Sequence, residues 1–65
     1  DGLSAIRKVI KKSGKLIKKK GLLVLEISFN QKNDVKKILK KNGFYINKTL
    51  KDLANNDRCI VGTKI

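Results

Sequence analysis

The spacing of hydrophobic residues in the first part of the chain is that of an amphipathic helix. Four apolar side chains share one helical stripe: Leu3, Ile6, Ile10 and Ile17. Lysines fill most of the other positions, so we predict a helix from about Leu3 to Ile17 that packs on a core rather than on a membrane surface. Gly14 costs this helix about 1 kcal/mol relative to Ala, which leaves a kink or an early end open.

A short apolar run predicts a strand from Leu22 to Ser28. Its side chains form two alternating sets, Leu23, Leu25 and Ile27 on one side and Leu22, Val24 and Glu26 on the other. Because apolar residues lie on both sides, the strand is expected to be covered on both faces, as in α/β proteins. A second helix should follow from about Gln31 to Asn42, with Asn30 as its cap and Gly43 as its stop signal. The buried stripe of this helix is Val35, Ile38 and Leu39.

Two more strands are predicted after this helix. Residues Phe44–Leu50 alternate as an outer strand would, in the sets Phe44, Ile46 and Lys48 against Tyr45, Asn47 and Thr49. Turn residues then cluster between Asp52 and Asp57, with Asn55–Asn56 at the tip. The last strand, Arg58–Thr63, contains an apolar Cys-Ile-Val run that favours a central position in a sheet.

The predicted order is helix, strand, helix, strand, strand, which is an α/β fold. The strand–helix–strand unit should be a right-handed parallel crossover, and the short final connection makes the last strand antiparallel. The apolar run favours placing that strand between the other two rather than outside them. Two helices then cover only one face, so one apolar set of the first strand should stay open. Such a patch promotes self-association, which the positive charge opposes.

The chain of 65 residues is a single domain at most, and 17 basic against 5 acidic residues give it a net charge of +12. This charge allows weak, non-specific binding to polyanions. Lys, Asn and Ile nevertheless supply 15, 6 and 8 positions, a joint excess that A/T-rich codons produce. Only two basic residues are Arg and only three side chains are aromatic, so we interpret the charge mainly as solvated surface. A small basic module that binds nucleic acid or protein is the alternative.

The residue types limit the chemistry. The chain has no His, and its acids and single Cys show no metal-ligand spacing. Cys59 is predicted to be a small buried hydrophobe, and one unpaired cysteine is typical of a reducing cytoplasm. No apolar run approaches the roughly 18 residues of a membrane helix, so no membrane partner is expected.

Five polar residues are candidates for substrate contact or for shaping a turn. Glu26 ends an apolar strand, at the edge where open α/β sheets bind ligands, although neighbouring backbone amides or lysines could satisfy it instead. Gln31 follows this strand and could contact a substrate protein or simply begin the next helix. Asp52 and Asp57 can close the last turn by bonding backbone amides, and Arg58 can pair with either acid.

The same residues carry a resemblance to a known family. The chain resembles the C-terminal end of the HemK-type release-factor glutamine methyltransferases in successive pieces: Leu25-Glu26-Ile27, Gln31, Gly43-Phe44, Lys51-Asp52-Leu53, Asp57-Arg58, a short apolar strand and Gly62. Ser28 and Asn55–Asn56 stand where the family has Gly. The chain contains no Pro, and therefore no Asn-Pro-Pro-Tyr motif, and it lacks the Gly-rich turn that would cradle S-adenosylmethionine.

The resemblance implies that residues 1–65 are one fragment, the C-terminal part of a Rossmann-like methyltransferase domain whose antiparallel last strand is inserted into the sheet. The cytoplasmic parent would transfer a methyl group from S-adenosylmethionine to a glutamine of peptide chain release factors. Glu26 and Gln31 would lie on the substrate side, and Asp52, Asp57 and Arg58 would be structural. We expect no catalytic, cofactor-binding or metal-binding residue in the fragment. Alone it would be inactive, bind no S-adenosylmethionine and have a purely structural role.

Overall fold

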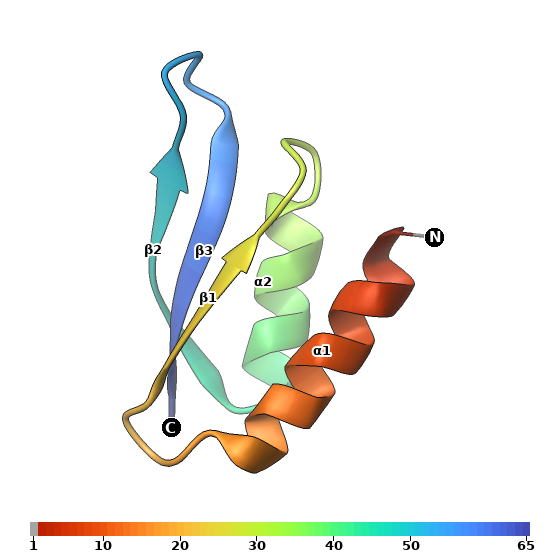
Figure 1. Ribbon diagram of the computed structural model, residues 1–65, viewed down its shortest axis with the longest axis vertical. Coiled ribbons are helices and arrows are strands. Elements are labelled where there is room, and N and C mark those ends of the chain that lie inside the picture. Colours follow the sequence, from red (N-terminus) through yellow and green to blue (C-terminus); the bar gives the residue numbers. More distant parts are fainter. Residues whose placement is uncertain (1) are drawn as a thin grey trace.

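A computed structural model describes residues 2–65 as two helices and one three-stranded sheet. The elements follow the predicted order: α1 (Gly2–Leu16), β1 (Leu22–Glu26), α2 (Lys32–Lys41), β2 (Phe44–Lys51) and β3 (Asp57–Lys64). Figure 1 shows the sheet on one side and the two helices on the other.

The first helix continues past Gly14 to Leu16, so the kink or early end that the sequence left open does not occur. A Cβ at Gly14 would lie 3.2 Å from the backbone oxygen of Asn42 and 3.7 Å from the Phe44 ring. The missing side chain therefore lets α1 approach the end of α2 closely. This packing compensates for the low helix propensity of glycine.

The start of α2 differs from the prediction, because Asn30 does not cap it. The N-cap residue is Gln31, whose side chain makes no capping hydrogen bond to the helix. The chain instead makes a tight turn before the helix, in which the Gln31 N–H donates to the Ser28 carbonyl oxygen at 3.0 Å. This turn places Asn30 one residue too early to cap the helix. At the other end the expected stop is confirmed, since Gly43 has φ +82.

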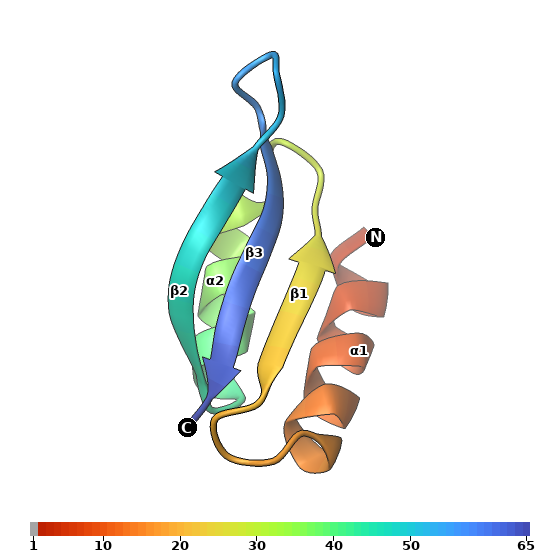
Figure 2. The same cartoon turned by 60° about the vertical axis from the view of Figure 1, so that its left-hand side comes forward.

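The sheet has the order β1-β3-β2, so the last strand lies between the other two, as predicted. Strand β3 is antiparallel to both neighbours, and β1 and β2 are therefore parallel to each other. In Figure 2 α2 lies behind the sheet, α1 lies to the right of β1, and β2 lies to the left of β1, so that the connection from β1 through α2 to β2 is a right-handed crossover. β1 ends at Glu26, two residues earlier than predicted, although the Ile27 N–H still donates to the Arg58 carbonyl oxygen at 2.8 Å.

A bulge in β2 overturns the simple alternation predicted for that strand. The register shifts between Ile46 and Lys48, so that Asn47 is left without a partner across the ladder. Lys48 then pairs with Val61, and Thr49 pairs with the buried Ile60. The extra residue therefore places Lys48 on the face opposite to Phe44 and brings Thr49 to the core side.

The core lies between the sheet and the helices. Its buried side chains come from every element or its flanking loop: Ile10, Ile27, Val35, Leu39, Phe44 and Ile60. The other face of the sheet is open, with Leu22 63% and Val24 59% exposed. One apolar set of β1 is thus left uncovered, as the sequence indicated. Cys59 pairs with Glu26 on this open face and is only half-buried, so the prediction of a buried cysteine is wrong.

Candidate functional site

The candidate residues gather at one end of the molecule. In Figure 1 the β2–β3 hairpin and the loop into α2 lie toward the upper end of the molecule, and β1 ends below that loop. Glu26 is the last residue of β1 and is exposed, while Gln31 follows at the end of the loop. The sheet register carries Cys59, the residue next to Arg58, to a position opposite Glu26. The topology therefore brings the β1 edge and the hairpin side by side.

Gln31 holds the loop together. Its side-chain oxygen accepts a hydrogen bond from the Ser28 N–H at 3.0 Å. Its Nε2 faces the first turn of α1, where a Cβ at Gly2 would lie 3.0 Å away. The side chain is half-buried between loop and helix. Its oxygen therefore shapes the loop, and its amide nitrogen is turned toward α1.

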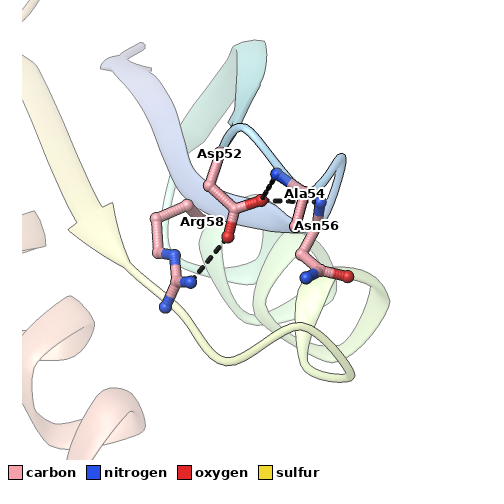
Figure 3. A network of polar contacts seen from close by, with 4 residues as sticks. All are labelled: Asp52, Ala54, Asn56 and Arg58. Carbon is pink, nitrogen blue, oxygen red and sulfur yellow. Dashed lines mark hydrogen bonds and ion pairs between the residues drawn. The ribbon is translucent and has the colours of Figure 1, made fainter.

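Asp52 organises the hairpin, as Figure 3 shows. Its Oδ1 accepts the backbone N–H groups of Ala54 and Asn56, each at 3.0 Å. Its Oδ2 accepts a hydrogen bond from Nη2 of Arg58 at 2.6 Å. The Asn56 amide, followed by Arg58, lowers the pKa of Asp52, because each stabilises the carboxylate. Asn55 takes φ +65 at the tip, a left-handed conformation that Asn tolerates.

Arg58 connects the hairpin to the edge of β1. Its hydrogen bond to Asp52 is the main reason that the pKa of Arg58 is raised, and the negative charge of Glu26 raises it further. One guanidinium therefore lies within electrostatic reach of two carboxylates. This arrangement holds a cation beside Glu26 at the strand end, where it can orient a polar group of a ligand.

Asp57 forms an ion pair with Lys32 rather than with Arg58, the residue that follows it in the sequence. Its Oδ1 lies 3.7 Å from Nζ of Lys32, the first residue of α2. That oxygen is buried and has no hydrogen-bond partner among residues 2–65, so the ion pair with Lys32 is what opposes its charge there. Arg58 pairs with Asp52. The two acids thus connect different elements, one within the hairpin and one between β3 and α2.

The described residues of the site offer orientation and charge. Within residues 2–65, no cluster of three or more His, Cys, Asp or Glu residues could hold a metal ion. Neither described helix has the length and apolar character needed to cross a membrane. Sequence reasoning missed one further surface, a groove between α1 and α2 lined mainly by basic side chains. The sequence signal that could have predicted this groove is the four-residue spacing of Arg7 with Lys11 and of Lys37 with Lys41.

Comparisons with known proteins place the chain beside methyltransferases. It is 42% identical over 64 residues to the release factor glutamine methyltransferase of Fusobacterium nucleatum, covering 98% of this chain and 18% of that protein. It is 36% identical over 64 residues to the enzyme of the same name from Clostridium acetobutylicum, covering 98% and 22%. A bifunctional methyltransferase of Rickettsia felis is 38% identical over 65 residues, covering 100% and 12%.

The chain therefore spans about a fifth or less of the length of these curated relatives. No protein-family model matches it, and no solved structure matches it. The similarity nevertheless extends along the whole chain, including the β1 edge and the hairpin described above. It relates this chain, from end to end, to a segment of the HemK-type release factor glutamine methyltransferases.

Proposed function

We propose that the chain is the C-terminal segment of an S-adenosylmethionine-dependent methyltransferase that modifies a glutamine of peptide chain release factors in the cytoplasm. The observation that carries this proposal is the 33–42% identity, along nearly the whole chain, to relatives named release factor glutamine methyltransferase. The segment supplies part of the catalytic domain, and by itself it transfers no methyl group.

The topology supports a place in a Rossmann-like sheet. Strands β1 and β2 form a parallel pair with a helical crossover, and antiparallel β3 lies between them. That is the arrangement which the family resemblance implies for the end of the domain. In the parent, β1 is the edge at which this segment joins the rest of the sheet.

The open face supports a larger parent as well. Leu22 and Val24 on β1 and Tyr45 on β2 are more than half exposed on the face away from the helices. An apolar sheet face is normally buried against another layer. We infer that other elements of the parent cover this face, because the curated relatives are at least four times longer than the chain.

The site residues then have distinct roles. Glu26, exposed at the end of β1, is on the substrate side, where its carboxylate can accept a hydrogen bond from the glutamine amide of the substrate protein. Arg58, fixed by Asp52, keeps a positive charge beside it. Gln31 is placed on the same side and shapes the adjoining loop through its side-chain oxygen. S-adenosylmethionine, when bound by the parent, supplies the methyl group.

A segment exchange tests the proposal. The matching 64 residues of the Fusobacterium nucleatum enzyme are replaced by this chain, and transfer of a labelled methyl group to that organism's release factor is measured. We expect an active chimera, and we expect Glu26→Gln in it to lower methylation while cofactor binding is unchanged. A chimera that folds and binds S-adenosylmethionine but methylates nothing would contradict the proposal.

The isolated chain provides the second half of the test. Calorimetric titration with S-adenosylmethionine should show no measurable binding, because the chain lacks the Gly-rich turn that would hold the cofactor. Saturable micromolar binding would show that the cofactor contacts lie in this segment after all.

A further inference from the structure

Basic charge is concentrated on the helical side of the molecule. Five basic residues lie on α1 and five on α2, whereas Asp34 is the one acidic residue within these two described elements. The opposite side is the open apolar face of the sheet. The two sides therefore suit different partners. The proposed methyltransferase function gives a role only to the apolar sheet face.

The basic side is hollowed between the two helices. A groove of about 790 Å³ runs there, with Arg7 and Lys11 on one wall and Lys37, Lys40 and Lys41 on the other. Asp34 is the acidic residue that also lines it. Arg7 and Lys11 are four residues apart on one helix, as are Lys37 and Lys41 on the other, which spaces charges about 6 Å apart along each axis. Two rows of cations thus face a common channel.

The chemistry of the lining favours phosphates over a protein surface. Protein interfaces use aromatic or large apolar anchors at their centre. Ile38 is the apolar residue of this groove, and no aromatic side chain lines it. Lysine is a good partner for a phosphate as a point charge, but four of the five cations lack the planar fork that reads a base edge. The groove therefore fits a charged backbone without regard to sequence.

Proteins that bind single strands without regard to sequence use a positively charged groove that follows the backbone. We propose that the groove between α1 and α2 binds the phosphodiester backbone of a single-stranded nucleic acid. This inference does not depend on the methyltransferase assignment, because the groove is lined by residues of α1, α2 and the end of α2, whereas the open face belongs to the sheet.

The test compares two variants of the whole chain that lose the same charge. The groove variant combines Lys11→Gln, Lys37→Gln and Lys41→Gln, and the control combines Lys19→Gln, Lys48→Gln and Lys51→Gln away from the groove. All six side chains are exposed, so both variants should keep the fold, which circular dichroism checks. Fluorescence anisotropy with a labelled uridine 20-mer is recorded between 50 and 200 mM salt, with a thymidine 20-mer in a parallel series.

The expected effect follows from counterion release, which gives a slope of about −0.7 per phosphate contact for single strands. With five contacts, binding of the unmodified chain should weaken about 130-fold over this salt range, and with two contacts about 7-fold. The control should behave like the unmodified chain. RNA that binds more tightly than DNA would identify RNA as the ligand, and equal binding would identify the shared phosphodiester backbone.

Two outcomes would overturn the proposal. Equal loss in both variants would show that binding follows net charge and not the groove. Competition by polyglutamate at the same charge concentration as the 20-mer would assign the groove to an acidic protein instead.

Discussion

One substitution made at two positions tests which face of the sheet is buried. Val35 on α2 is fully buried, whereas Val24 on β1 is 59% exposed on the open face. Val→Thr replaces a methyl group by a hydroxyl of similar size at both sites. Val and Thr have similar helix propensities and are both β-branched. The difference between the two variants in the loss of unfolding free energy therefore reports how deeply each side chain is buried.

The expected magnitudes follow from the environments of the two side chains. A hydroxyl buried without a partner costs about 1–3 kcal/mol. At position 35 the hydroxyl can reach the Gln31 carbonyl oxygen, which already accepts the Val35 N–H at 2.9 Å, so part of that cost is offset. We expect Val35→Thr to lower the free energy of unfolding by about 1–2 kcal/mol and Val24→Thr by less than about 0.5 kcal/mol.

Urea unfolding followed by circular dichroism measures the difference. A core of this size supplies only about 3–5 kcal/mol, so Val35→Thr removes a large share of the stability. With a denaturant slope near 1 kcal/mol per M, the midpoint should fall by roughly 1–2 M for Val35→Thr and by less than about 0.5 M for Val24→Thr. Equal losses at the lowest protein concentration would mean that Val24 is buried in the monomer, which would refute the open-face description.

Three further predictions concern the sheet, the open face and the hairpin. Amide exchange should leave Ile60 and Val61 among the most protected residues, because β3 is paired on both sides; fast exchange at both would contradict the central strand. Sedimentation should show a monomer at low salt that associates as salt screens the lysines. A chain that stays monomeric at high salt and binds no hydrophobic dye would instead have a covered face. The pKa of Asp52 is lower when folded, so its contribution to stability is complete above the unfolded pKa and is lost as pH falls through the folded one. Asp52→Asn should therefore unfold in urea with a weaker pH dependence in acid than the unmodified chain, and an unchanged dependence would exclude this role.

Local sequence patterns determined the elements and most of their ends. The helical stripe around Ile10 and the apolar run from Leu22 predicted α1 and β1, because residues close in the chain decide periodicity. The stop at Gly43 also followed from one residue, since glycine adopts a positive φ without a steric penalty. The central place of β3 could be inferred because an apolar run needs neighbours on both sides.

Other features depended on contacts between distant residues, which no local pattern contains. The helix continues through Gly14 because the end of α2 packs against it, and the bulge at Asn47 arises from the pairing of β2 with β3. From the sequence, Arg58 could pair with either Asp52 or Asp57. In the folded hairpin Nη2 of Arg58 lies 2.6 Å from Oδ2 of Asp52, while Asp57 pairs with Lys32. The basic groove likewise exists only because two lysine-rich helices pack side by side, so the tertiary structure alone turned charge spread along the chain into a surface.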